Sequence, residues 1–231
     1  PSQQRVPFTG GDHAMNVHLE TLGCARNQVD SEMMSGLLEK AGFHLTADPK
    51  AAEIIVVNTC GFIEDAVSES IETILSLAEY KTKGRCRLLI VAGCLTQRFG
   101  EQLPPDLPEV DLFLGTGALD RLPDLIASTH PHGACLLPDP RLLTFTDYAK
   151  TRRPEEESPF AYLKIAEGCD KHCTYCIIPK LRGPQRSRSL EGLLEEARML
   201  VEKGKKELVL VAQETTFYGR DTGNATALVD L

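Results

Sequence analysis

The sequence has no apolar run long enough to cross a membrane, no excess of positive charge, and no second close pair of cysteines. The first absence excludes a transmembrane helix, which needs about 20 predominantly apolar residues in succession. The formal net charge of −8 and the pI near 5.3 disfavour a dedicated nucleic-acid binder, whose footprint is a basic surface. The third absence disfavours a closed structural zinc site, which commonly uses two such pairs. No apolar signal segment opens the chain, so we expect a cytoplasmic protein and no disulfide framework for the eight cysteines.

The densest group of chemically active side chains is a run of three cysteines, Cys169, Cys173 and Cys176, in the pattern C-x3-C-x2-C. Three thiolates are one fewer than a four-iron cluster usually binds, so one iron is left open. An open metal position can bind a substrate or cofactor, whereas a fully ligated cluster mainly transfers electrons. A zinc knuckle on Cys173 and Cys176, with Cys169 or His172 as a third ligand, is the alternative interpretation.

Charge is distributed unevenly along the chain. Between Phe160 and Leu190 two acidic residues, Glu167 and Asp170, accompany six basic ones: Lys164, Lys171, Lys180, Arg182, Arg186 and Arg188. A solvated basic face and a site for an anionic cofactor or macromolecule both fit this excess.

Strand and helix patterns alternate from residue 16 onward. Apolar and β-branched runs predict parallel strands over residues 17–22, 54–57, 88–92 and 112–114. Apolar residues at helical spacing predict helices over residues 29–41, ending at Gly42, and 63–78, with a stop at Gly84. This order predicts an α/β fold with a Rossmann-like parallel sheet. We assign residues 16–129 to this N-terminal domain and residues 1–15 to a disordered leader.

Three further cysteines, Cys24, Cys60 and Cys94, follow the carboxyl ends of the first three predicted strands. These ends share one edge of a parallel sheet, where open α/β folds bind ligands. We therefore expect the three thiols to meet in space as a second three-thiolate set with its own vacancy. The alternative is that they are buried small hydrophobic residues, a common role of cysteine. Cys86 and Cys135 lack this placement, and we interpret them as structural.

A second domain is predicted after a linker. Residues 130–158 are rich in Pro, His, Asp and Glu and show no lasting period, which indicates the linker. A βαβ pattern follows, with a strand over residues 162–166, a helix between Ser189 and Gly204, and a strand over residues 208–212. A complete β/α barrel needs roughly 200 residues or more. Residues 159–231 are therefore expected to be the opening part of a barrel, a truncated second domain.

The two cysteine sets together resemble those of the methylthiotransferases, a family of radical S-adenosylmethionine (SAM) enzymes. The matching stretches are LGCARNQVDSE (residues 22–32), NTCGFI (58–63), VAGC (91–94), IIPKLRG (177–183) and AQETTFYG (212–219). Within the family, the match is closest to members that modify an aspartate of a ribosomal protein. The tRNA-modifying members share the cysteines but usually differ after Cys24, after Cys60 and around Gln213.

This resemblance implies a ligand set and a reaction. Cys24, Cys60 and Cys94 would hold an auxiliary [4Fe–4S] cluster that carries the sulfur, and Cys169, Cys173 and Cys176 would hold the [4Fe–4S] cluster that binds SAM. Tyr175 would lie near the SAM adenine, and Gln213 and Glu214 near its methionyl end. No residue is assigned a catalytic role. The reaction would replace a β C–H bond of an aspartate in a small-subunit ribosomal protein with a methylthio group.

The same resemblance implies partners and leaves alternatives. The partners would be the ribosomal protein, an electron donor such as a flavodoxin-like protein, and a sulfur donor that the sequence does not identify. The family's later barrel strands and C-terminal TRAM domain have no counterpart here, so we expect these 231 residues alone to be inactive. One alternative is a methylthiotransferase acting on an N6-modified adenosine of tRNA. The other is a non-catalytic iron–sulfur fragment.

Overall fold

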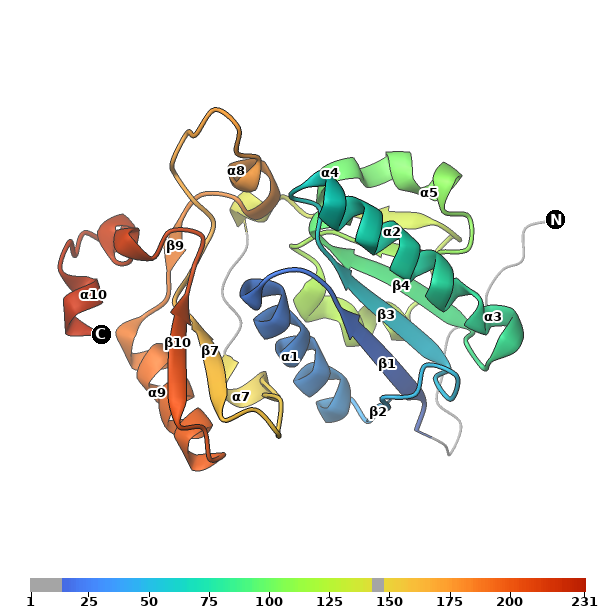
Figure 1. Ribbon diagram of the computed structural model, residues 1–231, viewed down its shortest axis with the longest axis horizontal. Coiled ribbons are helices and arrows are strands. Elements are labelled where there is room, and N and C mark those ends of the chain that lie inside the picture. The colour runs from blue at the N-terminus through green and yellow to red at the C-terminus, as the bar shows by residue number, and fades with distance from the viewer. Residues whose placement is uncertain (1–13, 143–147) are drawn as a thin grey trace.

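The computed structural model describes residues 14–142 and 148–231, which form two α/β units packed against each other (Figure 1). Residues 1–13 of the predicted leader lie outside the described residues. Among the helices of the described ranges, none is long and apolar enough to cross a membrane.

The first unit is built on a parallel sheet of six strands in the order β2-β1-β3-β4-β5-β6. The strands are β1 (Asn16–Thr21), β2 (His44–Leu45), β3 (Ile54–Thr59), β4 (Leu88–Gly93), β5 (Leu112–Leu114) and β6 (Ala134–Leu136). Every residue of β3 and β4 is buried, and the two strands pair from Ile54 opposite Leu88 to Thr59 opposite Gly93. The aliphatic runs IIVV of β3 and LLIVA of β4 suit strands covered on both faces. The predicted parallel α/β sheet is confirmed.

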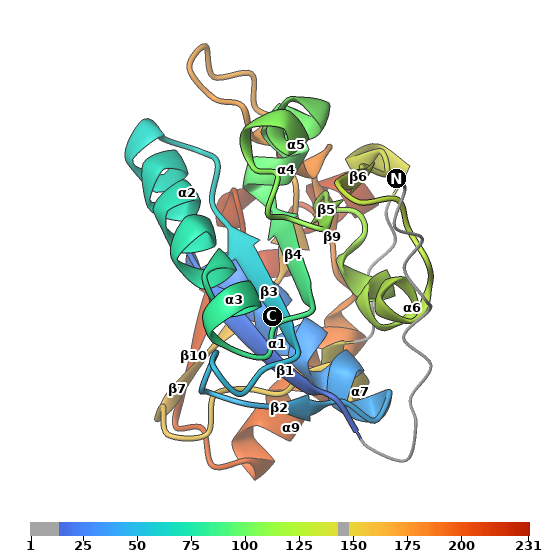
Figure 2. The same cartoon turned by 90° about the vertical axis from the view of Figure 1, so that its right-hand side faces the viewer.

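Helices cover both faces of this sheet (Figure 2). One face carries α1 (Ala25–Lys40) and α6 (Leu122–Ala127), and the other carries α2 (Glu64–Ala78), α3 (Tyr80–Lys83), α4 (Cys94–Phe99) and α5 (Leu103–Asp106). Alternate strand residues divide between the two cores, because successive side chains of a strand point to opposite faces. Val56 and Ile90 face α1, whereas Val57 and Val91 face α2. Gly42, with φ of +90°, follows α1 as predicted.

The second unit is a βαβ element of β7 (Phe160–Lys164), α9 (Leu190–Glu202) and β10 (Glu207–Val211). The two strands are parallel, with Leu163 opposite Leu210. The Ser189 side chain accepts a hydrogen bond from the Gly192 amide at 3.2 Å and so caps α9, as its sequence position predicts. The other elements of this unit are β8 (Ala166–Glu167), α8 (Ile178–Arg182), β9 (Arg186–Ser187) and α10 (Ala227–Asp230). Short 3-10 turns span Gly100–Gln102, Leu119–Arg121, Pro140–Leu142, Thr215–Phe217 and Arg220–Thr222.

The structure differs from the sequence prediction in the segment 130–158. Strand β6 extends the sheet beyond residue 129, with Phe113 opposite Cys135. Helix α7 (Tyr148–Thr151) packs against both α1 and α9, and the Tyr148 ring is buried. A three-residue strand and a one-turn helix are too short to show a period, and contacts with distant residues stabilise both. Residues 143–147 of this segment lie outside the described residues.

Buried ion pairs connect the second unit to helix α1. Arg152 donates from Nε to Glu32 of α1 at 2.6 Å and from Nη1 to Glu196 of α9 at 2.5 Å. Glu196 also pairs with Arg188 at 2.5 Å. Charges taken out of water need such partners, because an unpaired buried charge costs several kcal/mol. Helix α1 therefore belongs to the core of the first unit and to the interface with the second (Figure 1).

Candidate metal centre

The parallel sheet brings Cys24, Cys60 and Cys94 to one edge. Cys24 is the N-cap of α1, Cys60 directly follows β3, and Cys94 is the first residue of α4 after β4. Cys94 is buried, whereas Cys24 and Cys60 are partly exposed. All three lie at the carboxyl ends of parallel strands, where ligand sites of open α/β folds are found.

Glycines next to these cysteines allow the three loops to touch. Gly23 has φ of +92°, and a Cβ atom there would lie 2.7 Å from Cys60 Cβ. A Cβ atom on Gly61 would lie 2.8 Å from the carbonyl oxygen of Cys94. These distances leave no room for a side chain, so only glycine permits the approach. The loops are thus in contact, as ligation of one compact cluster by three cysteines requires.

The second set of cysteines lies in the loop that follows β8. Gly168 has φ of +79°, and a Cβ atom there would lie 2.0 Å from the Pro184 carbonyl oxygen. Its neighbour Cys169 is buried, and the Cys169 amide donates to the Gly183 carbonyl at 3.1 Å. Cys176 is partly exposed and Cys173 is exposed. Backbone packing therefore fixes the start of this loop, while its two later cysteines are more exposed.

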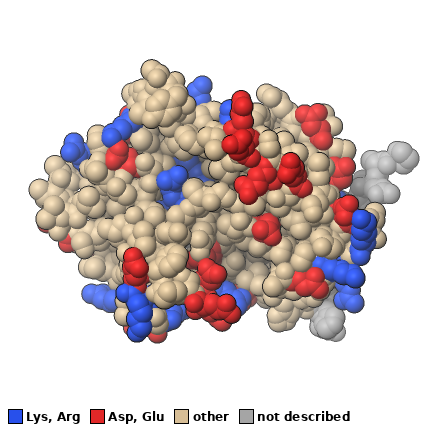
Figure 3. Space-filling view, in the orientation of Figure 1, with Lys and Arg blue, Asp and Glu red and all other residues tan. Residues whose placement is uncertain are grey.

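Both cysteine sets line one cavity of about 570 Å³ between the two units. All six predicted ligands take part: Cys24, Cys60, Cys94, Cys169, Cys173 and Cys176. The basic residues that line the cavity are Arg26, Lys171 and Arg182, and Figure 3 shows a hollow between the two halves of this face with basic atoms inside it. Within residues 14–142 and 148–231 no group of three His, Cys, Asp or Glu is spaced for a single metal ion. A four-iron cluster has a different requirement, because its thiolates bind different iron atoms.

The residues predicted to contact SAM also lie at this cavity. Gln213 and Glu214 follow β10 and line the wall opposite the sheet edge. Gln213 Nε2 donates to Glu167, and Gln213 Oε1 is buried without a partner among the described residues. Glu214 forms an ion pair with Lys171. Tyr175 lines the cavity but is 84% exposed.

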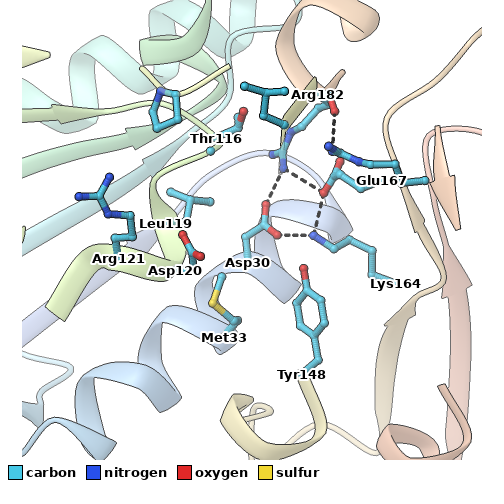
Figure 4. Close-up of a pocket in the computed structure, with 14 residues that line it drawn as sticks. Asp30, Met33, Thr116, Leu119, Asp120, Arg121, Tyr148, Lys164, Glu167 and Arg182 are labelled. Carbon is cyan, nitrogen blue, oxygen red and sulfur yellow. Dashed lines mark hydrogen bonds and ion pairs between the residues drawn. The ribbon is translucent and has the colours of Figure 1, made fainter. Parts of the chain in front are cut away.

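A buried network of charges lines a second pocket, of about 260 Å³, which shares Arg182 with the cysteine cavity (Figure 4). It joins Asp30 of α1 to Lys164, Glu167 and Arg182 of the second unit. Burial alone would raise the pKa of Glu167, but Lys164, 2.8 Å away, and Arg182 lower it to about 2. Burial would also lower the pKa of Lys164, yet Asp30 and Glu167 outweigh it and hold that pKa above its ordinary value. Lys164 and Glu167 are therefore held in their charged forms.

Arg182 connects this network to the cysteines. Its Nε and Nη2 each lie 3.3 Å from Cys94 Sγ, and Nη2 also donates to Asn27 Oδ1 at 2.7 Å. Burial raises the pKa of the Cys94 thiol, and the Arg182 charge opposes that effect. Asn27, Asp30 and Arg182 all lie in the motif stretches quoted above, but sequence reasoning gave Asn27 and Asp30 no role and counted Arg182 only among the basic residues of the segment 160–190. Lys164, Arg182 and Arg188 are buried, so a solvated basic face does not describe these three residues.

Cys86 and Cys135 lie apart from the cavity. Cys86 precedes β4, at the opposite end of that strand from Cys94, and it is buried in the core beneath α2. Cys135 of β6 packs against the same core, where burial and then Glu101 raise the pKa of its thiol. These positions support the structural interpretation of both residues.

Comparison with family models divides the chain in two. Residues 16–115 match the Uncharacterized protein family UPF0004, and residues 163–229 match the Radical SAM superfamily. The solved structure of the radical SAM methyltransferase TsrM from Kitasatospora setae, with tryptophan and a SAM analogue bound, aligns with a TM-score of 0.63 and 14% identity. The alignment covers 94% of this chain and 50% of the TsrM chain. At 14% sequence identity the similarity concerns the fold alone.

Curated relatives are more similar in sequence. The ribosomal protein uS12 methylthiotransferase RimO of Desulfosudis oleivorans is 53% identical over 218 residues, which are 94% of this chain and 49% of the relative. The protein of the same name from Anaeromyxobacter sp. is 52% identical over 209 residues, or 90% of this chain and 44% of the relative. The chain thus spans about half the length of the curated relatives it matches. Both relatives are named as methylthiotransferases of a ribosomal protein.

Proposed function

We propose that this chain serves to transfer a methylthio group to a ribosomal protein. The premise is its similarity to RimO, which extends over 94% of the chain. The substrate is uS12 of the small subunit, and the modified atom is the β-carbon of an aspartate. The observation that carries the proposal is the convergence of two three-cysteine sets on one cavity. A reaction that joins sulfur to an unactivated carbon needs both centres within reach of one substrate.

Two [4Fe–4S] clusters fit the six cysteines. Cys24, Cys60 and Cys94 hold the auxiliary cluster at the sheet edge, and Cys169, Cys173 and Cys176 hold the cluster that binds SAM. The glycine contacts at Gly23 and Gly61 support the first assignment, because they bring three cysteine loops together. When bound, SAM and the clusters supply the methyl group, the sulfur and the one-electron chemistry that activates a C–H bond.

The chain's own residues bind and orient SAM. Gln213 Oε1 is a buried acceptor without a partner in the described parts of the chain, and Glu214 is a carboxylate on the same wall. Both groups suit the ammonium group of a methionyl end. The exposed Tyr175 ring is placed to cover an adenine by stacking.

The partners follow from the proposed reaction. A one-electron donor such as a flavodoxin-like protein would supply the electrons, and a sulfur donor that the sequence does not identify would supply the sulfur. A protein that modifies uS12 acts where ribosomal proteins are made, which is the cytoplasm in a bacterium.

Deletion of the whole gene that includes this coding sequence tests the proposed function. We expect uS12 from the deletion strain to lack the mass of one methylthio group, and we expect the gene to restore it. A gene carrying Cys94→Ala should fail to restore the modification, whereas Cys86→Ala should succeed. Unmodified tRNA together with normal uS12 in the deletion strain would contradict the proposal and favour the tRNA-modifying alternative.

A further inference from the structure

The Arg182 side chain contacts residues of both units at the interface between them. It is 4% exposed, and it ends helix α8 of the second unit. Two of its nitrogens face Cys94 Sγ at 3.3 Å. Its Nη1 pairs with Asp30 at 2.7 Å and contacts Glu167 at 3.4 Å. The guanidinium group therefore joins a cysteine of the sheet edge to the charge network of the second unit.

The backbone around Arg182 holds it in this position. Thr116 Oγ1, from the loop after β5, donates to the Leu181 carbonyl at 2.7 Å. On the other side Gly183 has φ of +74°, and a Cβ atom there would lie 2.7 Å from the Pro140 carbonyl oxygen. Residues of the first unit thus hold α8 immediately before and after Arg182. The contact with Cys94 does not depend on the rotamer of a free surface side chain.

We propose that Arg182 is a positioning residue of the auxiliary cluster, so that the first unit's three-cysteine site is complete only when the second unit is docked. The proposal rests on the proposed function, because it takes Cys24, Cys60 and Cys94 as the cluster ligands. Arg182 donates hydrogen bonds to the ligating sulfur of Cys94. It also places a positive charge beside the cluster.

The physical consequences concern redox potential and cluster retention. Hydrogen bonds to cluster sulfur and a nearby cation stabilise the more negative, reduced state and so raise the reduction potential. They also hold the thiolate in place and slow the loss of iron. An arginine suits this role better than a lysine, because its planar fork reaches Cys94, Asn27 and Asp30 at once.

The experiment isolates the auxiliary cluster in the full chain. A background protein in which Cys169, Cys173 and Cys176 are all replaced by Ala should retain about four iron atoms after anaerobic reconstitution, the content of one four-iron cluster. In this background we compare Arg182→Met with Arg188→Met. Arg188 is an equally buried arginine of the same unit, but it pairs with Glu196 rather than with a cysteine.

Arg182→Met should lower the midpoint potential of the cluster and speed the release of iron to a chelator several-fold. Arg188→Met should leave the potential at its background value. An unchanged potential and an unchanged release rate in folded Arg182→Met would overturn the inference. If the background protein binds no iron, the ligand assignment in the proposed function has failed, and the inference fails with it.

A second variant covers the case in which Arg182→Met does not fold. Arg182→Lys keeps the charge that balances Asp30 and Glu167, so the interface should survive. A lysine cannot make the same set of contacts. We therefore expect the Arg182→Lys protein to release iron faster than the background protein. Where Arg182→Met folds, the rate for Arg182→Lys should lie between those of the background protein and Arg182→Met. Iron release no faster than in the background protein, together with an unchanged EPR spectrum, would reject the role of Arg182.

Discussion

At the residue scale, the sequence located the cysteines but not the groups that surround them. Cys24, Cys60 and Cys94 could be placed because each follows a strand, and parallel strands end at a common edge. Arg182 lies 88 residues from Cys94 in the chain, and no local pattern links the two. The contact between them is visible only in the structure, where a helix of the second unit lies against the first.

The cysteine assignment makes a prediction for iron content. The reconstituted chain should hold about eight iron atoms, the sum of two four-iron clusters. Cys94→Ala should lose about half of them, because one thiolate set becomes incomplete. Cys86→Ala and Cys135→Ala serve as matched controls and should keep full iron content, since both thiols pack in the core away from the cavity. Loss of half the iron from Cys86→Ala would show that the assignment is wrong.

At the element scale, the long strands and helices could be predicted, but the short elements could not. Strands β3 and β4 are buried throughout, and their composition reveals this. Strand β6 and helix α7 lie in the segment that the sequence predicts as a linker. They were not predicted, because elements of three or four residues show no period in a segment rich in Pro, His and acidic residues. What stabilises α7 is the packing of Tyr148 and the ion pairs of Arg152, and both need partners from distant parts of the chain.

A substitution of Arg152 measures how much the buried ion pairs between helices α1, α7 and α9 contribute to the free energy of unfolding. Arg152→Met removes a cation that is fully buried between Glu32 and Glu196, and it should lower the free energy of unfolding by about 3 kcal/mol. Arg153→Met is the adjacent control with the same change in charge. Arg153 pairs with Glu39 at the surface, so its loss should cost under about 1 kcal/mol. Equal urea midpoints for the two variants would mean that the buried pairs do not stabilise the interface.

At the scale of the whole molecule, the two units divide one site between them. The sequence predicts two domains separated by a linker, which suggests that each cluster belongs to its own domain. In the structure, the six cysteines line a single cavity, and Asp30 and Glu32 of α1 pair with residues of the second unit. Cys24 is the N-cap of helix α1, and the helix continues into this interface. The geometry of one cysteine set is thus coupled to the docking of the segment that carries the other.

The 231 residues by themselves should bind iron but not complete the reaction. Within the described residues β10 pairs only with β7, and Leu210 of β10 and Val201 of α9 are 40% and 58% exposed. The chain spans about half the length of the relatives it matches, and a β/α barrel closes only when further strands cover such an edge. We therefore expect negligible formation of 5′-deoxyadenosine with SAM and dithionite, despite full iron content.

A fusion protein provides the matched positive control. Joining the chain to the C-terminal half of the Desulfosudis oleivorans relative should produce SAM cleavage that Cys173→Ala abolishes. Robust, cluster-dependent SAM cleavage by the 231 residues alone would show that further strands are dispensable for this step.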